Sequence, residues 1–344
     1  MNSKCSLPLN RLRPSTGAGA ERMPRITASM ISPWVAVAVL VSASFAFASP
    51  AKLASGKDPE PTRSAGAPES VQSPPALSPQ MTVQRIEALI AQKGPSALLC
   101  SQLGYARYRN HQPDKSLDAF TAMLKFRQPN ADELRIIALD YVELRDLQSA
   151  DKWLRASLKL NASDWRTWRY LGGVQFSEEL IADATTSFRE CLKLDPDNAL
   201  AEDGLARSLE AQGNAAEAHS HFELANKLNL ADASPSPLPL LHYGEFLFRQ
   251  QKNAQALQEL TAAAKLAPND SETHEYLSQV YQQTGQMSPA LKQMRMASQL
   301  RPESPRLHLL LGRLYRQIGN RIAADREIKL YVQLSREHKE DWDR

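Results

Sequence analysis

The sequence is poor in cysteine, glycine and aromatic residues. It has 3 cysteines and 14 glycines in 344 residues, and aromatic side chains make up 7% of it. Three cysteines are too few for a disulfide scaffold or a four-cysteine zinc site, and so little glycine argues against a collagen-like or β-rich chain. Hydrophobic residues at 42% and charged residues at 23% are typical of a folded soluble protein.

Most of the chain also lacks an excess of charge of either sign, although the formal net charge is +3. Of the 41 basic and 38 acidic side chains, five basic and one acidic lie in residues 1–48, which leaves 36 basic and 37 acidic in residues 49–344. A nearly neutral folded region gives no electrostatic reason to bind nucleic acid, so no such partner is expected.

Charge is missing altogether from residues 27–51, which follow a basic stretch ending at Arg25. Within them, residues 34–48 form an apolar run that ends in the triplet Ala-Phe-Ala. A basic region, an apolar run and an A-x-A-like cleavage site are the three parts of a secretory signal, so residues 1–48 are interpreted as a signal peptide. The alternatives are an uncleaved anchor, since residues 31–50 are nearly long enough to span a bilayer, and a cytosolic chain with a misassigned start.

These interpretations predict where the protein acts. We expect it to be periplasmic or secreted or, if residues 31–50 stay attached, tethered to a membrane by that segment alone. Residues 49–80 follow, with 7 of the 22 prolines and almost nothing large and apolar. Such a segment cannot bury enough surface to offset its chain entropy, so it is interpreted as a disordered linker.

The rest of the sequence is one unit repeated seven times, with steps of 34 residues and a single step of 38. Small residues recur at Gly104, Ala138, Gly172, Ala206, Gly244, Ser278 and Gly312, and again at Ser116, Ala150, Ala184, Ala218, Ala256, Ala290 and Ala324. Large apolar residues recur at Phe120, Leu154, Phe188, Phe222, Leu260, Met294 and Ile328. Registers that agree at seven places cannot come from composition, so these residues are assigned as a repeat. Within each unit, apolar residues recur at three- and four-residue spacing, which predicts two helices per unit.

The unit resembles the tetratricopeptide repeat, and residues 165–198 carry the resemblance best. They place Trp168, Leu171, Gly172, Ala184, Phe188 and Pro196 at the positions of that motif. The resemblance implies an all-α, right-handed α-solenoid of helix–turn–helix units over residues 97–338. The units are 97–130, 131–164, 165–198, 199–232, 237–270, 271–304 and 305–338, between an expected capping helix at 81–96 and a charged tail at 339–344.

The 38-residue step places an insertion at residues 233–236, between the fourth and fifth units. We interpret it as a tolerated surface loop, with a hinge between units as the alternative.

Residues suited to catalysis or metal binding are not grouped in the sequence. No Ser/Cys–His–acid grouping, H-E-x-x-H motif or glycine-rich phosphate loop occurs. Cys100 and Cys191 lie on different units, too far apart to bridge. His274 and His308 share one slot of the repeat and are interpreted as packing residues. We therefore expect no catalytic, cofactor-binding or metal-binding residues and no cofactor, and a protein that is not an enzyme.

The resemblance further implies that the first helix of each unit lines a concave groove that holds an extended peptide. The residues expected in that groove are Arg166, Arg169, Phe176, Arg207, Phe248, Arg249, Arg306, Arg313 and Arg316. Arginines with aromatic anchors suit a partner that carries acidic groups or a free C-terminus. The alternative is a solvated helix face. The family's carboxylate clamp has Asn in the ninth slot, and none of the seven units has it, which disfavours a receptor for chaperone tails.

Two functions from different classes follow. The first is a non-catalytic protein–protein interaction scaffold, exported or membrane-tethered, that binds an extended peptide or partner protein in the concave groove. The second is an accessory structural subunit of a cell-envelope enzyme or of a secretion or assembly complex, which uses its convex face or its ends.

Overall fold

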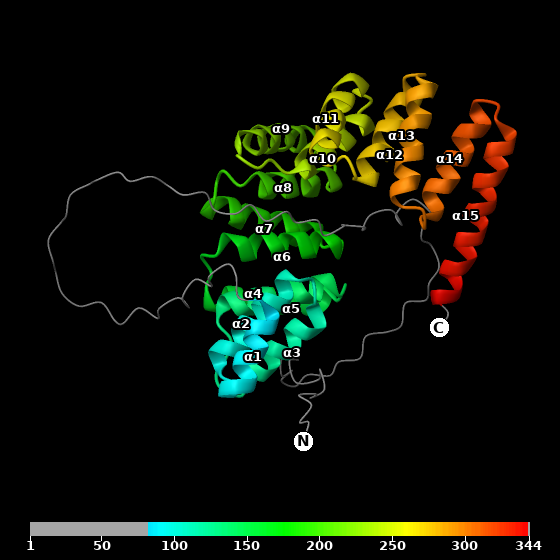
Figure 1. Ribbon diagram of the computed structural model, residues 1–344. Coiled ribbons are helices and arrows are strands. Elements are labelled where there is room, and N and C mark those ends of the chain that lie inside the picture. The colour runs from blue at the N-terminus through cyan, green and yellow to red at the C-terminus, as the bar shows by residue number, and fades with distance from the viewer. Residues whose placement is uncertain (1–81, 343–344) are drawn as a thin grey trace, which may run out of the picture. The chain divides into compact units, whose positions relative to one another are not determined.

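The computed structural model describes residues 82–342, and their side chains through residue 337. The expected signal or anchor at 1–48 and the linker at 49–80 lie outside the described residues. The described part contains fifteen helices and no strand, which confirms the predicted all-α repeat fold (Figure 1). It falls into two compact units, residues 82–179, called unit 1, and residues 180–342, called unit 2. Among these helices, none combines the length and hydrophobicity needed to cross a bilayer.

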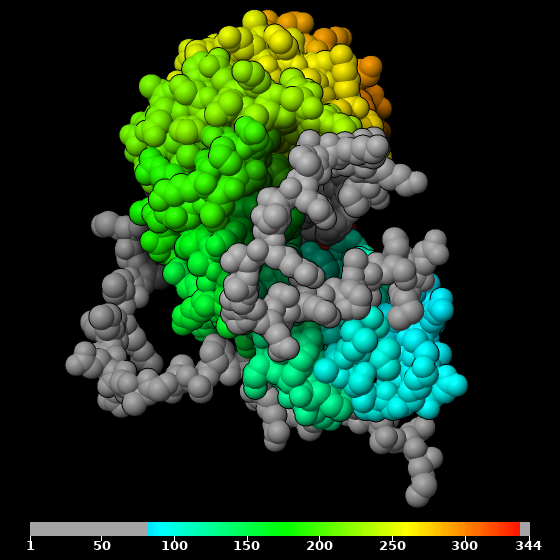
Figure 2. Space-filling model, turned by 90° about the vertical axis from the view of Figure 1, so that its left-hand side faces the viewer, coloured from blue at the N-terminus to red at the C-terminus, as the bar shows by residue number. Residues whose placement is uncertain are grey.

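Unit 1 is built from six helices. They are α1 (Val83–Lys93), α2 (Ala97–Arg109), α3 (Pro113–Met123), α4 (Ala131–Glu143), α5 (Leu147–Leu160) and α6 (Trp165–Ser177). α2 pairs with α3 and α4 with α5, while α1 packs on α2 and α6 on α5. α1 and α2, in cyan, lie side by side at the surface (Figure 2). The amphipathic helix α1 buries Ile86 against α2, and so covers an apolar face that α2 would otherwise expose.

Unit 2 continues the pattern with nine helices. They are α7 (Ile181–Leu194), α8 (Ala199–Ala211), α9 (Ala215–Ala231), α10 (Pro237–Arg249), α11 (Asn253–Leu266), α12 (Ser271–Gln283), α13 (Met287–Leu300), α14 (Pro305–Gln317) and α15 (Arg321–Trp342). The pairs are α8–α9, α10–α11, α12–α13 and α14–α15, and each pair packs on the one before it. We call α2, α4, α6, α8, α10, α12 and α14 the A helices, and the second helices of the pairs the B helices.

Side chains directly before six of the seven A helices cap them, and α14 has no such cap. The caps are Ser96, Asn130, Asp164, Asn198, Ser236 and Asp270, and each accepts a hydrogen bond from a backbone N–H in the first turn. At α4 the cap is reciprocal, because the Glu133 carboxylate also accepts from the Asn130 N–H at 2.9 Å. Each cap satisfies a backbone donor that has no partner inside its helix.

The turn after each A helix uses a residue in the left-handed region. Unit 2 has Gly213, Gly285 and Gly319 there, and Gln251 at φ 59°. Unit 1 has no glycine at the same point: His111, Arg145 and Glu179 take φ of 51°, 61° and 62°. Non-glycine residues in this region carry a steric cost that glycine avoids.

The small residues of the repeat lie against the large ones. A Cβ added to Gly104 would sit 2.6 Å from the Phe120 ring, and one added to Gly244 would sit 2.6 Å from Leu260 Cγ. Contacts this short do not fit, so the A helix approaches its partner only where the slot stays small. The large residue therefore fills space within its own helix pair.

The insertion at residues 233–236 lies in the loop after a lengthened helix. α9 has 17 residues, against 14 in α11. The buried side chain of Asn229 closes the loop, since its Nδ2 donates to the Ser236 carbonyl and its Oδ1 accepts from the Ser236 N–H, both at 2.8 Å. These bonds hold the loop to its helix; a hinge at this point stays a prediction.

Candidate interaction surface

The residues predicted for the groove all lie on A helices, so we examine the surface these helices present, called the A-helix face of each unit. Arg166, Arg169 and Phe176 lie on α6 of unit 1. The other six lie in unit 2, with Arg207 on α8, Phe248 and Arg249 on α10, and Arg306, Arg313 and Arg316 on α14.

In unit 1 the two arginines stack on aromatic rings of their own helix. Arg166, with 56% of its side chain exposed, places its guanidinium carbon 4.5 Å from the centre of the Trp165 ring. The same atom of Arg169 is 4.3 Å from the centre of the Tyr170 ring. A cation over a ring face at an exposed site gains about 0.5–1 kcal/mol, so both guanidinium groups are oriented on the surface of α6.

Unit 1 also carries an aromatic surface that the sequence analysis did not single out. Tyr105 and Tyr108 on α2 and Tyr170 on α6 are half-buried and pack around one apolar core that includes Leu139. None of the three hydroxyls hydrogen-bonds to the described part of the chain, and none is sealed from solvent. We call these three residues the tyrosine cluster. Burial raises the pKa of Tyr105 and of Tyr108, so both stay protonated donors.

A buried carboxyl group lies beside this cluster, on α4. Asp140 is 0% exposed, and neither of its side-chain oxygens has a hydrogen-bond partner. The adjacent Ser116 hydroxyl donates to the Gly104 carbonyl at 3.0 Å. Burial, together with the smaller effect of the charges of Glu143 and Asp114, raises the pKa of Asp140 to about 8, although the nearby Ser116 hydroxyl lowers it. At neutral pH this side chain is mostly protonated and neutral.

In unit 2 two of the predicted arginines are held by carboxylates of neighbouring A helices. Arg249 contacts Glu210 on α8 and Glu245 on its own helix, each at 2.9 Å. The Tyr276 hydroxyl on α12 donates to the same Glu245 carboxylate. Burial raises the pKa of Glu210, and Arg249 opposes the shift. The arginine therefore helps tie α8 and α10 together.

The same arrangement recurs between α12 and α14. Arg306 lies 2.7 Å from the carboxylate of Glu275, whose side chain is 2% exposed and which also accepts from Gln279 Nε2 at 2.8 Å. Burial raises the pKa of Glu275, and Arg306 opposes that shift. We call the set Glu210, Arg249, Glu245, Tyr276, Glu275 and Arg306 the ion-pair ladder. Asp203 and His242 link α8 to α10 beside it, at 2.7 Å.

Two predicted arginines of α14 stay outside the ladder. Arg313 and Arg316 lie one turn apart on α14, both exposed, and neither pairs with any described residue. Arg207 and Phe248 are half-buried. Glu272 on α12, also half-buried, has no ion-pair partner in the described part of the chain, and burial followed by the charge of Glu245 raises its pKa. The unpaired positive charge of this face is thus concentrated on α14.

The histidines and cysteines singled out in the sequence pack inside the helix pairs. His274 and His308 each bond through both ring nitrogens, to Gln293 and the Pro268 carbonyl and to Glu327 and the Pro302 carbonyl, at 2.6–2.9 Å. Cys100 and Cys191 are buried, and neither forms a disulfide with another described residue. Within residues 82–342, no three His, Cys, Asp or Glu side chains are grouped as a metal would require.

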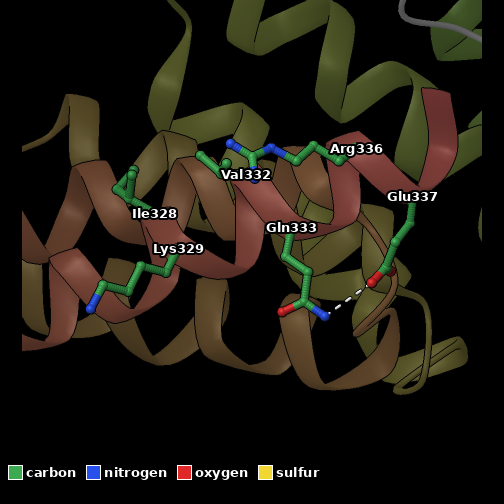
Figure 3. Close-up of a pocket in the computed structure, with 6 residues that line it drawn as sticks. All are labelled: Ile328, Lys329, Val332, Gln333, Arg336 and Glu337. Carbon is green, nitrogen blue, oxygen red and sulfur yellow. Dashed lines mark hydrogen bonds between the residues drawn. The ribbon is translucent and has the colours of Figure 1, made fainter. Parts of the chain in front are cut away.

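The last helix carries a hollow of about 430 Å³ along its C-terminal half. Ile328 and Val332 supply its apolar part, and Lys329, Gln333, Arg336 and Glu337 its polar part (Figure 3). The Gln333 amide donates to the Glu337 carboxylate at 3.0 Å across one helical turn. On the same helix, Ile322 is 80% exposed.

Comparison with solved structures supports the fold. The chain of the Cut9–Hcn1 hetero-tetramer of the APC/C superposes with a TM-score of 0.60 over 74% of this chain and 49% of that chain, at 13% identity. This protein therefore spans about half the length of that chain. PilW, a type IV pilus biogenesis factor, superposes with a TM-score of 0.52 over 57% of this chain and 90% of that chain, at 20% identity. No curated protein matches the sequence.

Family models give the assignment independently of shape. Two models described as tetratricopeptide repeats match residues 137–199 and 247–314, one in each half of the repeat region. The helix pairs, the small and large registers and the turn after each A helix recur with the same period in both matched segments. The protein belongs to the tetratricopeptide repeat family.

Proposed function

We propose that this protein is a non-catalytic interaction scaffold that binds an extended peptide or a segment of a partner protein on its A-helix face, the concave groove of the repeat family. The observation that carries the proposal is the pair Arg313 and Arg316, exposed on one helix without ion-pair partners among the described residues. Side chains three residues apart on a helix are neighbours, so the two guanidinium groups can hold one carboxylate together.

The proposed partner carries acidic side chains or a free C-terminus. In unit 2 the contact is made by Arg313 and Arg316, because Arg249 and Arg306 are already neutralised by the ion-pair ladder. In unit 1, Arg169 is supported by Tyr170, so an acidic group there meets a pre-oriented cation.

The proposal includes a location outside the cytoplasm, either periplasmic or secreted, or at a membrane through residues 31–50. Its support is the charge-free run after Arg25 and the Ala-Phe-Ala triplet at residues 46–48.

A second candidate function is an accessory structural subunit of an envelope enzyme or of a secretion or assembly complex, contacted at an end of the repeat array. The hollow along α15 and the 80% exposure of Ile322 favour it. Exposed apolar side chains beside a hollow are suited to burial against another chain.

A peptide selection separates the two functions. Short random peptides with free C-termini are selected against the full chain, and the tightest binder is measured by fluorescence anisotropy. A charge-assisted contact contributes about 1.5–3 kcal/mol, so the double variant Arg313→Glu/Arg316→Glu should weaken binding by at least about tenfold. The control is Arg295→Glu, which reverses an exposed charge on the B helix α13.

Equal affinity of the double variant and the control would contradict binding at the A-helix face of unit 2. Loss of binding on Ile322→Glu, with the arginine variant unaffected, would instead support the accessory-subunit function.

A further inference from the structure

We infer that the tyrosine cluster of unit 1 is the docking site for the protein's own proline-rich segment, residues 49–80. The inference rests on the proposed function, because the segment would occupy part of the same A-helix face that binds the partner. It adds a regulatory element to that face: a ligand built into the chain competes with the partner for unit 1 and leaves unit 2 free.

The chemistry of the cluster fits a proline-rich ligand. Its three rings pack on an apolar base that includes Leu139, and each keeps a hydroxyl without a hydrogen-bond partner in the described part of the chain. Proline-rich strands expose flat rings and backbone carbonyls that have no internal partners, and they bind in aromatic-lined grooves. Tyrosine supplies both complements, a ring face for the proline and an O–H donor for the carbonyl.

Position in the chain favours the protein's own segment over one from another molecule. Residue 80 lies just before α1, which packs on α2, the helix that carries Tyr105 and Tyr108. A ligand joined to its site by a few residues has an effective concentration in the millimolar range, so even a weak contact is occupied.

The length and charge of the segment agree with this placement. The fourteen residues 67–80 include Pro68, Pro74, Pro75 and Pro79. In a polyproline II conformation they extend about 40 Å at about 3.1 Å per residue, enough to cross from α2 past α4 to α6 at roughly 10 Å between packed helices. Their single charge is Glu69, opposite in sign to the arginines of α6.

Photo-crosslinking in the full chain tests the inference. The photoreactive amino acid p-benzoylphenylalanine replaces Tyr108, which keeps an aromatic ring in the cluster, or Lys152, an exposed residue of the B helix α5 that serves as the control. After irradiation without any added peptide, mass spectrometry measures the yield of links to residues 49–80. Because the segment is tethered next to its site, we expect a yield at least about tenfold higher from position 108, independent of protein concentration.

Equal yields from positions 108 and 152 would overturn the inference. So would an undiminished yield in the triple variant Pro74→Ala/Pro75→Ala/Pro79→Ala, because proline would then not be what the cluster recognises. Adding the peptide selected for the A-helix face separates the two proposals. If that peptide crosslinks to position 108 while residues 49–80 do not, the docking of the segment fails and the proposed function stands.

Discussion

The A-helix faces of the two units share one geometry but use different side chains. In unit 1 the predicted arginines stack on rings beside three half-buried tyrosines, and Arg135, which was not among them, forms close ion pairs on this face. In unit 2 two of the predicted arginines, Arg249 and Arg306, are themselves bound to glutamates of the helices beside them. The position within the repeat therefore determines whether a side chain faces the surface. Its contacts with neighbouring helices determine whether that side chain can still bind a ligand.

The two units also differ beneath that face. The buried slot that holds Asp140 in α4 holds Ser208 in α8, Val280 in α12 and Leu314 in α14. A buried carboxyl group without partners disfavours the folded state once it ionises. Stability should consequently fall with rising pH in unit 1 through Asp140, which has no oppositely charged partner in the described part of the chain, whereas in unit 2 arginines oppose the raised pKa values of Glu210 and Glu275.

The largest expected effect concerns Asp140, whose pKa is about 8 in the folded protein against an ordinary value of 3.8. Below about pH 4 the carboxyl is neutral in both the folded and unfolded states, and from about pH 4 to about pH 8 only the unfolded state loses the proton. Unfolding becomes more favourable by about 1.4 kcal/mol per pH unit over this window, for a total loss of about 6 kcal/mol. Asp140→Asn should remove this contribution and leave only the dependence that comes from other carboxyl groups with raised pKa values, such as Glu272 and Glu275.

Tryptophan fluorescence can follow the effect during urea unfolding, because unit 1 contains Trp153, Trp165 and Trp168. The matched control is Asp118→Asn, an exposed carboxyl on α3, which should keep the slope of the wild type. If wild type and Asp140→Asn lose stability in parallel as pH rises, the carboxyl is not the origin of the pH dependence.

The next effect tests the ion-pair ladder of unit 2. Arg306→Met leaves the Glu275 carboxylate, only 2% exposed, without its cation. Because Arg306 itself is 47% exposed and so partly screened by water, we expect a loss of about 1–2 kcal/mol in the free energy of unfolding, below the cost of breaking a fully buried pair. Circular dichroism during urea unfolding measures it. Arg313→Met on the same helix should change stability by less than about 0.5 kcal/mol, and equal effects would show that the ladder does not tie the helices.

The smallest effect concerns the left-handed turns, which unit 1 builds without glycine. Arg145→Gly removes the steric cost of a non-glycine residue at φ 61°. Glycine also gives the unfolded chain more conformational freedom, so the net stabilisation of unit 1 should be about 0.5–1 kcal/mol. Gly285→Ala, at φ 75° in unit 2, should cost about 1 kcal/mol. Thermal melts of both variants check the signs, and a shift of the same sign in both would contradict this account.

The repeat was predictable because burial follows the period of the helix. The small slot at Gly244 and the large residue Leu260 were assigned from sequence spacing, and the structure places them in contact. Such small and large positions can be identified from the sequence alone, because a buried position tolerates few residue types whatever its neighbours are.

The availability of the groove residues was not predictable in the same way. Arg249 binds Glu210, which lies 39 residues away along the chain, and no period of the sequence indicates which rotamers bring the two together. The tyrosine cluster could have been found from the sequence. Tyr105 and Tyr108 occupy the ninth and twelfth positions of their 34-residue repeat, which are the positions of Arg207 and Glu210 in the repeat that contains α8. Asp140 also left a signal, as an acid in a slot that is otherwise small or apolar.

The caps of the A helices have a consequence for how such a chain changes length. Asn198 and Asp270 each lie directly before the helix that they cap, so cap and helix belong to the same period of the sequence. A duplication or deletion of one whole period that contains such a capped helix carries the helix together with the side chain that begins it, and so keeps the capping hydrogen bond. It also carries one complete set of surface slots. The number of ligand contacts can therefore grow or shrink by whole periods during evolution, while the remaining helices keep their local structure.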